Sequence, residues 1–331
     1  MDEKVLRNLY ETRKYGDEAT EKALETVKAL ETYLEEKYET DLESCEKDQV
    51  KGYVGFMVSN GLNSLDNFLA LARYFYLTNC KEIYIFFTSV LGGLGVIENI
   101  KRRTEKYEGK EKLDQIFDDV EKPPLGATPE DFPEYTEKLM KKLSTCLPKD
   151  KYRKVLAGNN HGIPESSFDM EKKFFKESGN LEKYLKQRHE RKVAELQKHC
   201  DEGKVWFEQI ITQEIVDYVK SNQEILSGVI DGDRILNTKI PYATKEFIEA
   251  EDPKMKRYYT CHCPFARESI LRDDVNISMD WCYCSGGFQK YGYDVIFDEE
   301  TEVEVLESVL TGDSRCRFAI KIPEKIIKEY L

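Results

Sequence analysis

The sequence predicts an α+β fold, in which a helical N-terminal region is followed by a domain of helices packed on an antiparallel β-meander. Two observations support this prediction. In the first part of the chain, apolar residues recur every three or four positions, which is the spacing of one helix face. Toward the C-terminus, apolar and polar residues alternate instead, which is typical of strands buried on one face.

A proline-rich segment divides the chain. Four prolines fall within residues 121–133, and proline disfavours helix in the residue before it. We therefore expect a linker or surface loop here, with a helical N-terminal region at 1–120 and a second part at 134–331. The second part is expected to hold a helical segment and then an α+β, ligand-binding type of domain, with a cysteine-rich core at 258–323.

Most elements before Gly232 are predicted to be helices. Ala23, Val27, Leu30 and Leu34 mark the buried face of the first one. The predicted helices cover residues 17–44, 64–78, a segment that begins near 134, 169–201 and 205–226, with a further buried element at 83–97.

After Gly232, helices and strands are mixed. Pro264 suits the first position of a helix, and the turn at 311–314 joins the last two strands, with Gly312 expected at positive φ. The predicted helices are 241–250, 264–271 and 284–291, and the predicted strands are 256–260, 293–297, 303–309 and 316–322.

Charge and hydropathy exclude two classes of partner. The formal net charge is −13 and there is no compact basic run, whereas nucleic acids and anionic membranes attract basic surfaces. The most apolar stretch, 83–97, is shorter than the about 20 residues that span a bilayer. The charged N-terminus is unlike a signal peptide. We expect a cytoplasmic protein with reduced thiols, no nucleic-acid or membrane partner, and the capacity to form a homodimer.

Four of the nine cysteines form two Cys-x-Cys pairs, Cys261 with Cys263 and Cys282 with Cys284. Residues i and i+2 of an extended chain point the same way, so each pair could chelate a metal. Zinc prefers four ligands, although the usual structural spacing is Cys-x2-Cys, which neither pair has. The sequence therefore predicts either a site for zinc or another soft metal at these four cysteines, or a reactive thiol.

The reactive-thiol hypothesis rests on the position of Cys263. It precedes Pro264, which places it at the N-cap of the predicted helix 264–271, where backbone N–H groups and the helix dipole would lower its pKa. One turn further, Arg267 could bind a carboxylate in bidentate fashion, and Glu268 could move protons if burial raised its pKa. A surface ion pair is the alternative for the last two. Cys263, Arg267 and Glu268 are therefore the candidate catalytic residues.

Other residues have simpler explanations. Cys316 shares a predicted strand face with Phe318, so we expect it in the core, although it and His262 are also reserve metal ligands. His161 lies in a loop of turn-forming residues and is expected to be solvated.

The segment from Tyr258 to Pro323 resembles known families. It contains Cys-Pro-Phe-Ala at 263–266, Gly-Gly-Phe at 286–288 and a Gly-Asp-x-x-Cys-x-Phe strand at 312–318. This pattern is similar to the 4-vinyl reductase domain and its relatives, which include the small subunits of the transport-particle tethering complex. It also looks like the L-2-amino-thiazoline-4-carboxylate hydrolase family. The whole chain resembles uncharacterised bacterial proteins with the same Cys-His-Cys-Pro and Cys-x-Cys-Ser-Gly-Gly runs.

The resemblance implies helices on one face of an antiparallel sheet, with a small-molecule pocket between them. Cys263 and Cys316 would match the cysteines of the family pattern. With the residue patterns above, we predict a hydrolase that acts on a small carboxylate-bearing heterocycle or amide through a cysteine-based site, either thiolate or metal. The alternatives are a non-catalytic module that senses or binds a small molecule or metal, and an assembly protein.

Overall fold

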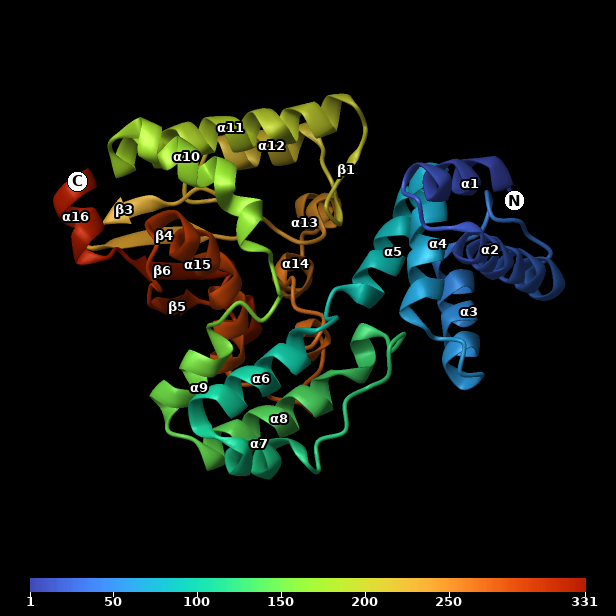
Figure 1. The fold of residues 1–331 in the computed structure, drawn as a ribbon, viewed down its shortest axis with the longest axis horizontal. Coiled ribbons are helices and arrows are strands. Elements are labelled where there is room, and N and C mark those ends of the chain that lie inside the picture. Colours follow the sequence, from blue (N-terminus) through green and yellow to red (C-terminus); the bar gives the residue numbers. More distant parts are fainter. The chain divides into compact units, whose positions relative to one another are not determined.

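The computed structural model describes every residue of the chain, from Met1 to Leu331. It is α+β, as predicted, with helices throughout and a small antiparallel sheet in the C-terminal part (Figure 1). The chain divides into two compact units. The first comprises residues 1–92 and 123–131, and the second comprises residues 93–122 and 132–331.

The first unit is a group of helices with its own apolar core. Phe68, Leu71 and Phe75 on one helix pack with Val27 and Leu30 on another. The predicted helices at 17–44 and 64–78 are confirmed in shorter form. The helices are α1 (Glu3–Thr12), α2 (Asp17–Tyr38), α3 (Lys47–Ser59), α4 (Leu65–Leu77) and α5 (Lys81–Leu91), with the short 3-10 helix η1 (Pro129–Asp131).

The second unit begins with a cluster of four helices, which Figure 1 shows as one group. They are α6 (Val96–Glu108), α7 (Lys110–Phe117), α8 (Pro133–Cys146) and α9 (Lys149–Leu156). The expected boundary at about residue 120 differs from this division, because Ile97, Ile100 and Ile116 are buried in the same core as Leu139 and Val305. Residues 93–122 therefore pack with the C-terminal part of the chain.

The rest of the second unit surrounds a four-stranded antiparallel sheet of order β3-β4-β6-β5. The strands are β3 (Val229–Asp231), β4 (Arg234–Thr238), β5 (Val303–Glu307) and β6 (Arg317–Lys321), and a separate two-stranded hairpin is formed by β1 (Val205–Trp206) and β2 (Gln209–Ile210). The helices are α10 (Asp169–Ser178), α11 (Leu181–Asp201), α12 (Gln213–Lys220), α13 (Thr244–Glu249), α14 (Pro253–Thr260), α15 (Tyr283–Phe297) and α16 (Glu324–Tyr330). The 3-10 helices are η2 (Glu165–Phe168), η3 (Arg267–Ile270), η4 (Met279–Cys282) and η5 (Val309–Thr311).

The last hairpin is confirmed. Strands β5 and β6 pair antiparallel, with Val305 opposite Phe318. Gly312 in the connection has φ +111°, and the Ser308 backbone N–H donates to the Asp313 carboxylate at 2.8 Å. The hairpin of β3 and β4 was not predicted, and it supplies the central strand that pairs with β6.

Two predicted strands are helices instead. Residues 256–260 lie in α14, because the Asp252 carboxylate caps it by accepting from the Met255 N–H at 2.8 Å and Pro253 occupies its first turn. Residues 293–297 are the last turns of α15. Tyr293, Val295, Ile296 and Phe297 are all buried there, so the apolar alternation came from a helix that is buried on most sides.

Two predicted long helices are interrupted. The segment 169–201 breaks at Gly179, whose φ of +66° ends α10, and Asn180 then caps α11. The segment 205–226 opens with the β1–β2 hairpin, in which Phe207 has φ +52°, and becomes helical only at Gln213.

Pro264 does not open an α-helix. The predicted helix 264–271 is instead a turn followed by η3.

The stretch Lys81–Glu108 is long and apolar enough, by length and composition alone, to cross a membrane. A helix in the core of a soluble protein passes the same test, so one such stretch is weak evidence. A turn at residues 92–95 separates α5 from α6 within it, and Gly95 has φ +76°. The cytoplasmic location stays a prediction.

Helix α15 is packed closely on two sides by means of adjacent glycines. A Cβ at Gly286 would lie 3.3 Å from the Val303 methyl groups of the sheet. A Cβ at Gly287 would lie 2.4 Å from the carbonyl oxygen of Gly158 and 2.6 Å from the carbonyl carbon of Ala157, just after α9. Gly286 therefore faces the sheet, whereas Gly287 faces the backbone that follows α9.

We predict that Gly287→Ala destabilises the protein by about 1–3 kcal/mol, since backbone atoms cannot move aside as side chains can. Gly286→Ala is the matched control. It gains the same helix propensity, and the Val303 methyl groups need move by only a few tenths of an ångström. Urea unfolding followed by circular dichroism measures both. Equal stability of the two variants would contradict this account of how α15 is packed.

Candidate functional site

The two Cys-x-Cys pairs and Cys316 come together in the second unit. Cys261, Cys284 and Cys316 are buried members of one apolar core, and Cys263 and Cys282 pack against it while partly exposed. The five thiols are near enough that their charges influence one another: ionisation of Cys263 raises the pKa of Cys261, Cys282 and Cys284. The structure thus brings together segments that are far apart in sequence.

Buried polar contacts hold these segments in place. The Thr136 hydroxyl of α8 donates to the Phe265 carbonyl oxygen at 2.7 Å, which fixes the turn after Cys263. Asp280, in η4 just before the second pair, accepts hydrogen bonds from Tyr152 Oη at 2.6 Å and Arg153 Nε at 2.9 Å. Asp280 is only 7% exposed, so an unpaired carboxylate here would be costly, and the hydrogen bonds from Tyr152 and Arg153 of α9 offset that cost.

Cys263 has the donors of a stabilised thiolate, although burial outweighs them. The Trp281 indole Nε1–H donates to its sulfur at 3.2 Å, and the backbone N–H groups of Phe265 and Ala266 and the Lys239 ammonium also favour the charged form. Loss of hydration is larger, and the pKa of Cys263 is raised. The expected lowering at a helix N-cap is therefore wrong, because no α-helix begins at Pro264 and the thiol is desolvated.

The other thiols of the cluster are also protonated at neutral pH. Burial raises the pKa of Cys284 to about 12, raises that of Cys282 well above its usual range, and raises those of Cys261 and Cys316. Cys282 Sγ lies 3.1 Å from Ser308 Oγ, and Cys284 Sγ lies 3.8 Å from His161 Nε2. Cys282 and Cys284 thus have polar neighbours within the protein.

No group of three histidine, cysteine or acidic side chains in the chain is arranged to hold a metal ion. The predicted zinc site at Cys261, Cys263, Cys282 and Cys284 is therefore not assembled in this structure. The reserve ligand His262 is otherwise engaged, since its Nε2 lies 2.7 Å from the Ile240 carbonyl oxygen. Helical geometry also separates Cys282 from Cys284, because residues two apart on a helix do not face the same way.

Lys239 is the central residue that sequence reasoning missed. It follows β4, and its Nζ donates to Ser285 Oγ in the first turn of α15 at 3.1 Å. Burial lowers its pKa, while ionisation of Cys316, Cys261, Cys263 or Cys284 would raise it. In the sequence, Lys239 lies between Thr238 and Ile240 without a distinctive pattern, and only the β3–β4 hairpin shows which residues it contacts.

The predicted catalytic residues Arg267 and Glu268 both lie in η3, shortly after Cys263 in the chain. The Arg267 guanidinium lies over the rings of Tyr242, at 4.8 Å, and Tyr258, at 5.4 Å. Its Nε has no hydrogen-bond partner although it is buried, and Glu268 Oε1 is 3.9 Å away. Glu268 accepts a hydrogen bond from Tyr258 Oη at 2.6 Å. These two residues thus form a polar cluster with tyrosines rather than a solvated surface pair.

Glu208, in the β1–β2 turn, is a second residue that sequence reasoning missed. Burial raises the pKa of this carboxyl, and the Tyr242 hydroxyl and the charges of Arg267 and Lys239 oppose that effect. A carboxyl group with a raised pKa, close to two cations and a tyrosine, is typical of acid–base sites. Residue 208 lies within the segment predicted to be one helix, so the sequence did not place it near the cysteines.

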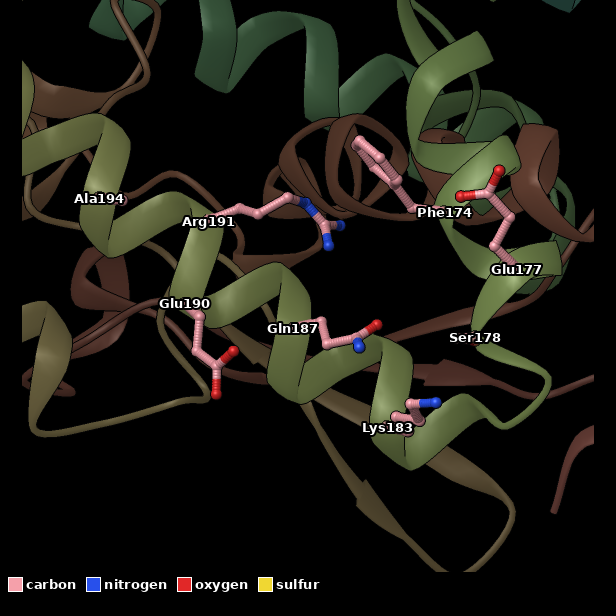
Figure 2. A pocket seen from close by; sticks show the side chains of 8 residues that line it. All are labelled: Phe174, Glu177, Ser178, Lys183, Gln187, Glu190, Arg191 and Ala194. Carbon is pink, nitrogen blue, oxygen red and sulfur yellow. The ribbon is translucent and has the colours of Figure 1, made fainter.

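A separate groove of about 560 Å³ lies between α10 and α11. Figure 2 shows Arg191 extending from α11 toward Phe174 on α10, and the Arg191 guanidinium lies 4.3 Å from that ring. Its remaining lining residues are Glu177, Ser178, Lys183, Gln187, Glu190 and Ala194. The groove has as many acidic as basic side chains and no thiol, so the cysteine cluster is the better candidate for chemistry.

Comparison with known proteins gives one match. A family of unknown function (DUF6144) has a model that matches residues 237–327, which is less than half of the chain. The matched segment contains Lys239, Arg267 and the five cysteines of the cluster. No curated protein and no solved structure matches the chain.

We predict that Trp281→Phe slows alkylation of Cys263 several-fold at pH 8. The indole N–H favours the thiolate, so its loss raises the pKa of Cys263 and leaves less thiolate to react. Mass spectrometry after brief iodoacetamide treatment measures the rate, with Cys146 of the same variant as reference. An unchanged rate ratio between Cys263 and Cys146 would show that the indole does not influence the thiol.

We predict that Glu208→Gln changes the free energy of unfolding in a more stabilising direction at pH 7 than near pH 4. Because the folded pKa of Glu208 is raised, its contribution is fully present below the unfolded pKa of about 4.3 and is lost as the pH rises through the folded value. Glutamine remains uncharged throughout. Urea unfolding at both pH values, with Glu182→Gln on the exposed side of α11 as control, tests this. A difference that grows toward low pH would have the wrong sign.

Proposed function

We propose that this protein is a thiol-dependent hydrolase of a small carboxylate-bearing heterocycle or amide, with Cys263 as the nucleophile. The observation that supports the proposal best is the environment of Cys263. It is partly exposed and shares a site with the Trp281 donor, the Lys239 amine and the Arg267 guanidinium. Nucleophile, hydrogen-bond donors and cations together are what acyl-transfer and related sites require.

The chemistry begins with removal of the thiol proton, because the pKa of Cys263 is raised. We assign this proton transfer to Glu208, in place of the role predicted for Glu268. The thiolate then attacks the electrophilic carbon of a C=N or C=O group, and the π electrons move to the nitrogen or oxygen. The electron pair then returns to re-form the double bond, the bond from carbon to the leaving nitrogen breaks, and that nitrogen takes the proton from Glu208. Water attacks the same carbon, the C–S bond breaks, and a proton from the water restores the thiol.

Arg267 is assigned to the substrate carboxylate. Its Nε has no hydrogen-bond partner within the protein, and 13% of its side-chain surface is exposed to solvent. Stacking between Tyr242 and Tyr258 fixes the plane of the guanidinium, so little conformational entropy is lost when a carboxylate binds in bidentate fashion.

A non-catalytic binding module is the second candidate. It is favoured by the raised pKa of all five clustered thiols, since a neutral thiol is a poor nucleophile. In such a module the cluster would recognise a small molecule without turning it over. The assembly role and the homodimer stay predictions.

We predict that the protein hydrolyses 2-amino-thiazoline-4-carboxylate or a related cyclic amidine acid, and that Cys263→Ala abolishes this activity. Arg267→Lys should raise KM by roughly 10- to 100-fold with a smaller change in kcat, because a lysine cannot form the bidentate pair. Liquid chromatography with mass spectrometry measures product formation.

Cys45→Ala is the control, since Cys45 lies in the first unit and should leave activity unchanged. Saturable binding of the same compound without product, weakened by Arg267→Lys, would favour the binding module. Turnover that persists in Cys263→Ala would remove Cys263 as the nucleophile.

A further inference from the structure

Lys239 is an amine without an acidic partner in an acidic protein. The chain has 63 aspartate and glutamate residues against 50 lysine and arginine residues, yet no carboxylate oxygen lies within 4.0 Å of Lys239 Nζ. Its Nζ has two neutral side-chain neighbours, Ser285 Oγ at 3.1 Å and the Phe288 ring centroid at 5.6 Å. Lys290, on the same helix as Ser285, is 3% exposed and shows the usual solution, an ion pair with Asp294.

The surroundings of Lys239 combine access with low polarity. The residue is partly exposed, as are Ser285 and Cys263, and Phe288 is 41% exposed. The thiols around it are protonated, and the nearby Glu208 carboxyl has a raised pKa and lies beyond the 4.0 Å of an ion pair, so neither pairs with Lys239. An ammonium group in such a place loses hydration without gaining an ion pair, which favours the neutral amine, and a neutral lysine amine is a nucleophile.

We propose that Lys239 captures the carbonyl group of a small aldehyde or 2-oxo acid as an imine. The nitrogen lone pair attacks the carbonyl carbon and the π electrons move to oxygen. Transfer of one amine proton to that oxygen gives a carbinolamine. Loss of the hydroxyl group with the second amine proton, as water, leaves the C=N bond. The Ser285 hydroxyl, 3.1 Å from the nitrogen, is placed to pass these protons.

An acid is favoured over an uncharged carbonyl compound by the charges of the site. Lys239 is uncharged both as the neutral amine and as the neutral imine, so Arg267 is the cation that holds a carboxylate. This part rests on the proposed function, in which Arg267 has the same role. Capture itself depends only on Lys239 and Ser285, and it does not require Cys263 to be a nucleophile.

Reductive trapping tests the proposal. The full-length protein is incubated with glyoxylate and sodium cyanoborohydride at pH 7.5, and modified lysines are located by peptide mass spectrometry. We expect modification of Lys239 to exceed that of Lys290 and of Lys328 several-fold. Lys290 is buried and paired, whereas Lys328 is exposed. Modification of Lys239 above that of Lys328 therefore cannot be explained by solvent exposure alone. Modification of Lys239 no greater than that of Lys328 would overturn the proposal.

Variants keep this test independent of the hydrolase proposal. Ser285→Ala should slow trapping at Lys239 several-fold while leaving Lys328 unchanged; an unaltered rate would exclude the proton-transfer role of the hydroxyl. Trapping should persist in Cys263→Ala, even though hydrolysis would be lost there. Loss of trapping in a folded Cys263→Ala protein would overturn capture by Lys239, because the carbonyl would then be bound through the thiol.

Discussion

The close packing of α15 is the constraint on which the rest of the second unit depends. Gly286 lets the helix approach Val303 on the sheet, and Gly287 lets it approach the backbone of Ala157 and Gly158. Helix α15 begins directly after Cys282 and carries Cys284 and Ser285 in its first turn. A helix held further from either neighbour would separate these groups from Lys239, and the candidate site would not form.

Desolvation then sets the chemistry of the site. Burial raises the pKa of every thiol in the cluster, raises that of Glu208 and lowers that of Lys239. All of these shifts favour the neutral form, as expected when hydration is lost without full pairing. The site therefore combines thiols, a carboxyl group and an amine, whose charged forms are all disfavoured by burial, with one fixed cation, Arg267. Both proposals follow from this arrangement, since neutral amines and readily exchanged protons suit reactions at carbonyl and imine carbons.

Buried polar contacts between distant segments anchor the candidate site. Asp280 fixes the start of α15 to α9 through Tyr152 and Arg153, and Thr136 holds the turn after Cys263. These contacts are buried or partly buried and connect residues more than 100 positions apart in sequence. They bring precision to side chains on short turns, which would otherwise be mobile.

The sequence by itself determined the α+β class and the last hairpin, and it singled out the cysteine pairs as a candidate site, because apolar periodicity, turn residues and clustered thiols are local signals. Only the tertiary structure decided which residues join those thiols. Lys239 and Glu208 lie on a hairpin end and a tight turn whose pairing the sequence did not reveal, and the raised pKa of Cys263 reflects its burial in the packed unit, which outweighs the hydrogen bond from Trp281. Burial is a property of the whole packed unit, so a local pattern could suggest an activated thiol but not the desolvation that reverses its pKa shift.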